Sequence, residues 1–588
     1  MLSSGSDIII YMEAQTKTCQ NCEKEFIIEA EDFGFYSKIG VPAPTFCPEC
    51  RNVQRLATRN VKSLYKRPCD NCGISVISRL SITNPARMFC NKCWWSEDWD
   101  PLSYGMDYDF SKSFFEQFHS LLFSVPQSAT LNFNMVDSDY SNMESDDKGC
   151  YLTFGGHWNE FCAFSEYSIH GREVYDSYWT FYGEQCYDGM NLERCYQTMY
   201  SRECKDCINT LFSYDCRGCS EIIGCAGLRH KSHCIFNQQY TKEEYFIEKA
   251  KLNLGSRDVI KDLIQKSHKV WLNSPHLFMI GNQVVNCTGN YIFNSKNAHN
   301  VWQAEAVENV KNLYIAAWSK DCHDETSAAG NELGYMNSHG GGLYNCKAVL
   351  YSFQSDFNKN KHTHNSEYSY NLLGSSDCFG CVGVRKKKYC ILNKQYTKEE
   401  YEELLKRIKE QMKEQPFISP SSGFVFSYGD FFPNEHSLFA YNETVANDFY
   451  PLTKDLAEQK GFVWREDTVS EYSFDNYNVP DGIQDVKDDI LKVVLKCEDS
   501  GKAYRIIEQE LTFYKKMNIS IPVVAPLQRI KNRINELLPF KLWHRQCMCD
   551  KTNHFHGEGK CDVEFETAYA HERPEIIYCE KCYQAEVL

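Results

Sequence analysis

The sequence predicts a mostly β, multidomain protein in which small cysteine-rich modules at both ends flank two solenoid-like halves, each closed by a helix. Three observations support this prediction: paired cysteines near both ends, central cysteines spaced by multiples of three, and two internal repeats. A chain of 588 residues is too long for one compact core. Its 43% apolar and 24% charged residues are typical of a globular protein.

The charge and the cysteine content limit the partners, the compartment and the cysteine chemistry that we expect. A formal net charge of −16 argues against a chain that coats nucleic acid over its whole surface, although it leaves room for local basic patches. No apolar run approaches the roughly 18 residues of a membrane span, and no secretory leader is recognisable, so we expect a cytoplasmic protein. The 30 cysteines would stay reduced there, which predicts metal ligands or small buried residues rather than disulfides.

The N-terminal module, residues 13–100, contains four C-x2-C pairs. Zinc favours four thiolates in a tetrahedron, and a C-x2-C turn places two sulfurs on one side of the ion. The alternative, redox chemistry, needs a thioredoxin-like βαβ context that these pairs lack. We therefore expect two zinc sites, one made by Cys19, Cys22, Cys47 and Cys50, and one by Cys69, Cys72, Cys90 and Cys93.

The spacing around the first site resembles a known sequence family. Beside Cys19-x2-Cys22, the shared features are Phe26, Phe35-Tyr36, Gly40, Pro42, Pro44 and the string Cys47-Pro48-Glu49-Cys50-Arg51. This pattern resembles the "probable zinc-ribbon domain" of uncharacterised bacterial proteins, and the whole chain is similar to large bacterial proteins that carry it. The resemblance implies zinc binding and no particular reaction.

The C-terminal region repeats the front module. Residues 19–69 align without a gap onto 497–547 at a constant offset of 478. In this alignment Ser500, Ala525 and Gln528 replace three of the four cysteines of the first site. Because ligands that are lost together worked together, the replacement supports one ion shared by the four front cysteines.

The second site persists in the repeat, which spans residues 486–588. The separation of 18 residues between Cys72 and Cys90 recurs between Cys561 and Cys579, and an insertion adds Cys549, His554 and His556. We expect a third zinc site, made by Cys547 or Cys549 together with Cys561, Cys579 and Cys582. The chain would then hold three structural zinc ions, each contributing folding free energy.

A basic stripe in each module suggests a partner. Arg51, Arg55 and Arg59 recur every four residues and so share one helical face. Zinc modules with such a face can contact the phosphates of a nucleic acid. RNA or a ribonucleoprotein suits an acidic protein at least as well as DNA does, and the sequence does not separate them. The alternative is a solvated helix face. The candidate contacts are Arg51, Arg55, Arg59, Lys62, Lys66 and Arg67 in the first stripe, and Arg529, Lys531, Arg533, Lys541 and Arg545 in the second.

The first central half, residues 101–253, begins with a predicted helix at 114–123 and continues with cysteines at a period of three. That period fits neither a flat strand nor a helix, but it fits a coiled β-solenoid that stacks small residues inside. The cysteines are Cys150, Cys162, Cys186, Cys195, Cys204, Cys207, Cys216, Cys219, Cys225 and Cys234. Cys204, Cys207, Cys216 and Cys219 could form a fourth zinc site, but we favour buried cysteines because the second half has Leu372 and Ser375 where Cys216 and Cys219 stand.

The second half, residues 254–413, carries asparagine and aspartate at the same period, and these residues tolerate tight corners. They are Asn294, Asn297, Asn300, Asn309, Asn312, Asp321, Asp324 and Asn345. Residues 224–245 match 380–401, and Thr241 and Thr397 each begin a capping box that predicts a closing helix. An aromatic segment, 414–485, follows.

The sequence contains no convincing catalytic constellation, so we expect a non-catalytic zinc-binding scaffold or macromolecule-binding protein. One alternative is a carbohydrate-binding or carbohydrate-cleaving β-helix. Its acids would come from Asp137, Asp139, Glu144, Asp146, Asp147, Asp324 and Glu325. The other alternative is a purely structural component of a larger assembly.

Overall fold

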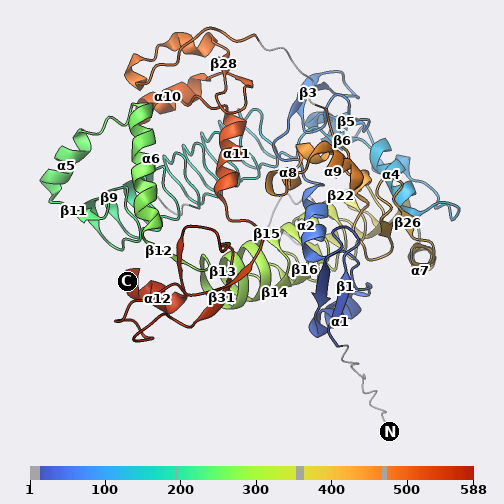
Figure 1. Cartoon of the computed structure of the whole chain (residues 1–588). Helices are drawn as coiled ribbons and strands as arrows, with labels where there is room; N and C mark the ends of the chain where they lie inside the picture. The colour runs from blue at the N-terminus through green and yellow to red at the C-terminus, as the bar shows by residue number, and fades with distance from the viewer. Residues whose placement is uncertain (1–12, 192–195, 353–362, 467–472, 588) are drawn as a thin grey trace. The chain divides into compact units, whose positions relative to one another are not determined.

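The computed structural model describes residues 13–191, 196–352, 363–466 and 473–587 (Figure 1). The chain forms two compact units, each built from two separate stretches. Unit 1 comprises Met1–Ala129 and Gly281–Arg465, and unit 2 comprises Thr130–Ile280 and Glu466–Leu588. The N-terminal module therefore belongs with the second central half and the C-terminal module with the first, a grouping that sequence order does not indicate. The aromatic segment 414–485 is divided between the two units.

The N-terminal module consists of two hairpins and three helices, two of which begin at a cysteine. Its elements are β1 (Gln15–Thr18), β2 (Glu25–Ile28), α1 (Ala30–Ile39), α2 (Pro48–Leu56), β3 (Tyr65–Pro68), β4 (Ser75–Ser78), β5 (Met88–Phe89) and α3 (Asn91–Trp95). The antiparallel pairs are β1 with β2 and β3 with β4. Cys47 caps α2, whose first residue Pro48 has the fixed φ that suits a helix start, and Cys90 caps α3.

The C-terminal module repeats this order. Its elements are β28 (Leu495–Lys496), β29 (Ala503–Tyr504), α10 (Glu508–Met517), α11 (Pro526–Glu536), β30 (Trp543–Gln546), β31 (Glu564–Thr567), β32 (Ile576–Tyr578) and α12 (Glu580–Val587). Helix α10 begins 478 residues after α1, and α11 begins 478 residues after α2. The offset read from the sequence therefore also relates the positions of the helices.

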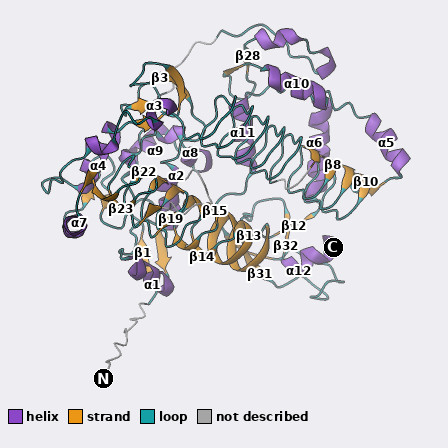
Figure 2. Ribbon diagram, turned by 180° about the vertical axis from the view of Figure 1, so that it is seen from behind, coloured by secondary structure: helices purple, strands orange, loops and turns teal. Residues whose placement is uncertain are grey.

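The first central half contains a parallel ladder, called here the first ladder, that runs from Phe133 to Ile235. Backbone bridges join residues twelve apart, beginning with Phe133↔Ser145 and ending with Arg217↔Arg229. The later layers contain the parallel strands β7 (Tyr196–Met199), β8 (Ile208–Leu211), β9 (Ser220–Ile223) and β10 (Ser232–Ile235). Strand β11 (Gln238–Gln239) pairs antiparallel with β10 at the end of the ladder. Figure 2 shows the layers as stacked turns with short strands toward one end. The chain thus advances one layer every twelve residues.

The second ladder, in unit 1, has the same step. Lys296 pairs with Glu308 and Glu308 with Lys320, but the step widens to twenty residues at Leu343↔Thr363. The strands are β13 (Gly281–Glu305), β14 (Glu308–Lys311), β15 (Tyr314–Ala317), β16 (Lys320–His323), β17 (Thr326–Ala329), β18 (Ser338–Gly340), β19 (Leu343–Tyr344), β20 (Leu350–Ser352), β21 (Thr363–His364), β22 (Tyr370–Leu372), β23 (Ser376–Phe379), β24 (Lys388–Ile391) and β25 (Lys394–Gln395).

Corners of the second ladder confirm the prediction made from asparagine and aspartate. Their φ angles lie between 49° and 60°, in the left-handed region that these two residue types tolerate better than other non-glycine residues. The corner residues are Asn294, Asn297, Asn300, Asn309, Asn312, Asp321, Asp324 and Asn345. Corner side chains also bond between layers: Asn297 Nδ2 donates to Asn309 Oδ1 at 3.0 Å, and Asn309 Nδ2 donates to Asp321 Oδ1 at 3.1 Å.

Cysteines of the first ladder lie in a buried cluster inside the ladder, together with Val174 and Ile222. Cys204, Cys207, Cys216 and Cys219 are at most 1% exposed, and the Cys207 thiol donates to the carbonyl of Cys216 in the next layer at 3.3 Å. The prediction of buried ladder cysteines is therefore confirmed for these four, and they are not among the clusters of the described chain that could hold a metal. Cys195 lies outside the described residues.

Helices follow each ladder where the capping boxes predict them. Thr241 Oγ1 accepts from Glu244 N at 3.2 Å and Thr397 Oγ1 accepts from Glu400 N at 3.3 Å. Ser113 and Glu116 form a third such box. The helices are α4 (Phe114–Ser124), α5 (Lys242–Ala250), α6 (Arg257–Leu272) and α7 (Lys398–Glu414), and α8 (Val445–Phe449) and α9 (Lys454–Gln459) follow. Of the helices described, none combines the length and apolar character of a bilayer span.

Replacing Asn309 with valine tests the corner geometry. A β-branched residue at a left-handed φ should lower the stability of unit 1 by about 1–2 kcal/mol relative to Asn309→Gly, because both variants lose the same side-chain hydrogen bonds and glycine alone tolerates the angle. Denaturant unfolding followed by circular dichroism measures the difference. Equal midpoints for the two variants would show that the backbone angle does not limit this position.

Candidate metal centres

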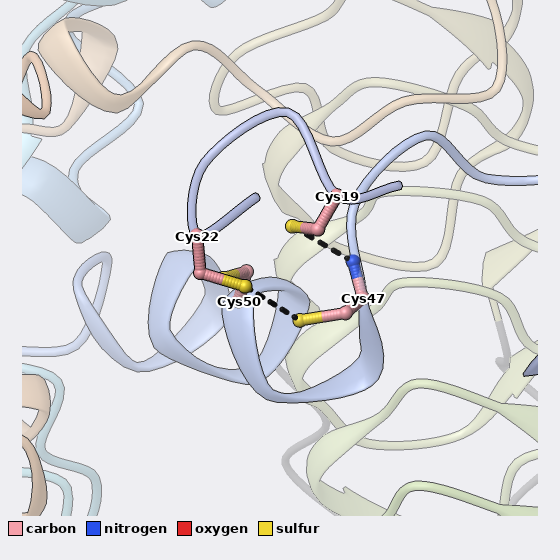
Figure 3. A group of neighbouring side chains, drawn as sticks. All are labelled: Cys19, Cys22, Cys47 and Cys50. Atoms are coloured by element: carbon pink, nitrogen blue, oxygen red, sulfur yellow. Dashed lines mark hydrogen bonds between the residues drawn. The ribbon is translucent and has the colours of Figure 1, made fainter. Parts of the chain in front are cut away.

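The first four-cysteine group joins a hairpin turn to a helix start (Figure 3). Cys19 and Cys22 lie in the turn between β1 and β2, and Cys47 and Cys50 lie at the first turn of α2. Cys22 Sγ lies 3.7 Å from Cys47 Sγ, and the four sulfurs all lie within 4.8 Å of one another. Zinc–sulfur bonds of about 2.3 Å in a tetrahedron separate sulfurs by about 3.8 Å. The predicted set of ligands is therefore brought together at a separation that suits zinc.

Backbone hydrogen bonds fix this arrangement. Cys19 N donates to Lys24 O at 2.9 Å and Glu23 N donates to Cys19 O at 3.0 Å, which closes the turn. Cys47 N donates to Cys19 Sγ at 3.3 Å. Such N–H groups at a turn and a helix start stabilise a thiolate.

The thiols of this group influence one another strongly. Hydrogen bonds from Cys47 and Cys50 lower the pKa of Cys19 far below its ordinary value. The hydrogen bond to Cys19 in turn raises the pKa of Cys47 to about 12. Four such sulfurs ionise together only when a cation balances their charge, which is what metal binding by thiolates requires.

The second group repeats the geometry on the next hairpin. Cys69 and Cys72 lie in the turn between β3 and β4, and Cys90 and Cys93 lie at the start of α3. Cys72 Sγ lies 3.8 Å from Cys90 Sγ, and Cys90 N donates to Cys69 Sγ at 3.1 Å. Gly73, with φ of 74°, directly follows Cys72 and closes the tight turn by donating its N–H to Cys69 O at 2.9 Å.

The third group lies in the C-terminal module and is wholly buried. It consists of Cys547, Cys561, Cys579 and Cys582, with Cys561 Sγ 3.9 Å from Cys579 Sγ and Cys579 N donating to Cys547 Sγ at 3.2 Å. The sequence left Cys547 and Cys549 as alternatives, and the structure places Cys547 in this group. Cys549 lies instead with His554 and His556.

The C-terminal module lacks three of the four cysteines of the first site but keeps the hairpin turn that would carry them. Ala525 N donates to Cys497 Sγ at 3.2 Å, as Cys47 N does to Cys19 Sγ. Ser500 N donates to the same sulfur at 3.4 Å. The remaining cysteine therefore acts as a hydrogen-bond acceptor that holds the hairpin against α11.

The predicted arginine stripe on α2 does not face solvent. Arg51 and Arg55 are 2% and 0% exposed and share the carboxylate of Asp324, a corner of the second ladder. Arg51 Nη2 lies 2.9 Å from Asp324 Oδ2, and Arg55 Nη1 lies 3.4 Å from Asp324 Oδ1. Arg59 is 1% exposed. The prediction of phosphate contact is wrong for these three residues, because a buried, paired guanidinium cannot reach a nucleic-acid backbone.

Unit 2 has the same contact. Arg529 Nε lies 2.7 Å and Arg533 Nη1 lies 3.1 Å from Asp176 Oδ1, and both arginines are buried. The prediction is therefore wrong for Arg529 and Arg533 as well. Periodic charge on a helix face is equally compatible with a solvated face and with a face docked on a carboxylate, so the sequence alone could not separate the two.

The other residues predicted to contact phosphates do not form a continuous basic surface. Arg67 donates to the carbonyls of Ser81 and Ala86, Arg545 donates to the carbonyls of Tyr569 and Ala570, and Lys62 pairs with Asp448 at 2.7 Å. The exposed members of the two stripes are Lys66, Lys531 and Lys541. They do not form a basic face with the buried arginines.

Aromatic contacts around the two shared aspartates also correspond. Phe35 of α1 stacks on His323 at 3.8 Å, and Phe513 of α10 stacks on Tyr175 at 3.8 Å. Both ladder residues precede the shared aspartate, and the two aspartates are 148 residues apart. The ends of the two ladders, however, match at an offset of 156 residues. The difference of eight between these two offsets equals the widening of one step in the second ladder from twelve to twenty residues. The two units therefore contain the same module-on-ladder arrangement.

The acids proposed for carbohydrate cleavage are placed unfavourably for that role. Glu144, Asp147, Asp324 and Glu325 are at most 2% exposed, and burial raises the pKa of Glu325 to about 7. Asp137 and Asp146 are exposed corners with left-handed φ, and Asp139 is exposed. The buried carboxylates cannot touch a sugar, so this set does not form a glycosidase site.

Asp324→Asn should destabilise unit 1 by about 3 kcal/mol or more, because it leaves two buried arginines without their counter-charge. The matched control is Asp321→Asn, at the preceding corner, whose partner Lys38 is 52% exposed. An exposed ion pair contributes about 1 kcal/mol or less. Thermal unfolding of both variants compares the two effects, and equal shifts would contradict a docking role for Asp324.

Three four-cysteine groups and one mixed cysteine–histidine group thus stand in the described residues as candidate metal centres. No family model matches the chain, and no curated protein is similar to it.

Proposed function

We propose that the protein is a non-catalytic zinc scaffold, in which zinc ions fold the two terminal modules and each module is fixed to a β-solenoid formed by one ladder. The observation that carries this proposal is the convergence of sulfurs, 3.7–3.9 Å apart, from a hairpin turn and the start of a helix in three places. The resemblance of the first module to the zinc-ribbon family agrees with it.

Zinc is the metal that fits these groups best. Soft thiolates favour Zn²⁺, Cu⁺ and iron–sulfur clusters over hard cations, and a lone tetrahedral ion with four thiolates is typical of structural zinc. Nine of the twelve cysteines in the three groups are buried. A closed four-sulfur shell leaves no position for a substrate, which supports a structural role.

The docking contacts give the scaffold its second element. Helix α2 carries two ligands of the first group at its start and the two arginines that bind Asp324 one turn later. A metal that fixes the start of α2 therefore also fixes the arginines against the ladder. This coupling between metal binding and docking supports a structural role for the protein rather than a catalytic one.

Exposed rings on the first ladder do not favour the carbohydrate-binding alternative. Trp158 stacks on His170 at 4.8 Å, and His170 stacks on Tyr182 at 5.2 Å, with interplanar angles of 9° and 7°. His170 has both of its faces covered, and Trp158 and Tyr182 each have one face covered by it, so the stack leaves less ring surface for a sugar. The stack supports the cohesion of the ladder instead.

Metal analysis of Cys50→Ser tests the proposal. The variant should lose one zinc ion per chain and unfold at a lower temperature, because three thiolates hold the ion less well than four. The matched control is Cys287→Ser, since Cys287 belongs to the ladder and to none of the described metal-competent groups. Full zinc content in Cys50→Ser, or wild-type protein purified under reducing conditions without zinc, would end the proposal.

A further inference from the structure

The C-terminal module contains a second set of metal-competent side chains beside the third four-cysteine group. Cys549, His554, His556 and Cys582 place one ligand atom each within 4.8 Å of the others. Cys582 belongs to both sets. The two sets therefore meet at one sulfur.

The distances in this second set suit a mixed nitrogen and sulfur shell. Cys549 Sγ lies 3.1 Å from His554 Nδ1 and 3.4 Å from His556 Nε2. Zinc–sulfur bonds of about 2.3 Å and zinc–nitrogen bonds of about 2.0 Å in a tetrahedron separate the two atom types by about 3.5 Å. Cys549 and Cys582 are 0% exposed, His554 is 7% exposed and His556 is half-buried.

A carboxylate orients one of the histidines. His554 Nε2 lies 3.0 Å from Glu586 Oε1, and His554 Nδ1 faces Cys549 Sγ on the other side of the ring. A carboxylate that accepts from the second ring nitrogen is the usual support of a histidine bound to zinc. The contact with Glu586 thus places His554 Nδ1 on the side of the ring that faces the other three candidate ligands.

The loop that supplies these ligands exists in one module only. In the front module, the corresponding pair Cys69 and Cys72 is joined by two residues, whereas thirteen residues separate Cys547 from Cys561. Gly557 and Gly559, with φ of 72° and 94°, let the longer loop fold back, and Cys561 N closes it by donating to Cys549 O at 2.9 Å.

We propose that the C-terminal module binds two zinc ions as a cluster bridged by the thiolate of Cys582. One ion takes Cys547, Cys561, Cys579 and Cys582, and the other takes Cys549, His554, His556 and the same Cys582. Sharing the sulfur lowers the charge of the site, because five thiolates exceed two divalent ions by one charge, whereas a separate four-thiolate site carries an excess of two. The proposal rests on the zinc binding proposed above and raises the expected content from three to four ions per chain.

Elemental analysis of the full-length reduced protein tests the number of ions. Wild type should hold four zinc ions per chain, and Cys549→Ser and His554→Ala should each hold three. The matched control is His544→Ala in the same module, whose exposed side chain contacts Glu564 and Glu566 and which should keep four. Three ions in wild type, unchanged by Cys549→Ser, would overturn the cluster and leave the scaffold proposal standing, whereas no zinc at all would overturn both.

Anomalous diffraction at the zinc edge tests the bridge without any variant. Two ions on one sulfur lie at most about 4.6 Å apart, twice the zinc–sulfur bond length. A crystal of the wild-type protein should therefore show a close pair of anomalous peaks beside Cys582 and single peaks at the two N-terminal groups. A single peak beside Cys582 would overturn the proposal.

Discussion

A shared aspartate at a ladder corner determines how each terminal module is attached. Asp324 receives Arg51 and Arg55, and Asp176 receives Arg529 and Arg533, with every partner buried. Removing one member of such a buried set leaves uncompensated charge, so the contact holds the helix in one register on the ladder. The aromatic stacks of α1 and α10 lie beside the same corners. In both units two buried guanidinium groups therefore share one corner carboxylate, and in unit 2 Arg529 also pairs with the buried Glu510 at 3.2 Å.

Metal binding and docking are separate constraints that meet on one helix. In unit 1, α2 carries Cys47 and Cys50 at its start and the two arginines just beyond. In unit 2, α11 starts at Ala525 and keeps only the arginines. Cys497 preserves the hairpin contact through backbone hydrogen bonds. Docking thus persists where the four-cysteine group does not, which indicates that a metal bound in unit 1 would stabilise the contact rather than create it.

Local patterns in the sequence predicted much of the local structure. The spacing of Asn297, Asn309 and Asp321 predicted corners, because asparagine and aspartate tolerate a left-handed backbone better than most residues do. The paired cysteines predicted the three four-cysteine groups, because a C-x2-C turn places two sulfurs on one side of a shared site. The capping boxes at Thr241 and Thr397 predicted helix starts from local hydrogen bonds alone.

Long-range relations were not predictable in the same way. Nothing in the cysteine spacing indicates that the N-terminal module shares a unit with the second ladder, because that pairing depends on contacts between residues more than 270 positions apart. The burial of Arg51 and Arg55 follows from that pairing, so the sequence could not show that these arginines contact the ladder rather than a phosphate. The sequence offers Cys549 only as an alternative to Cys547. The folding of the inserted loop, which brings a second set of ligands to Cys582, depends on contacts that the order of residues does not show.

We infer that the stability of α2 depends on a metal bound at the first four-cysteine group, and hydrogen–deuterium exchange of the intact protein with and without a zinc chelator tests this inference most directly. Chelation should speed exchange in α2 and at the ladder strand β17 that lies beneath it, while the amides of α11 remain protected, because its docking needs no ion at the helix start. Unchanged protection of α2 after the zinc is removed, or equal loss of protection in α2 and α11, would contradict the account.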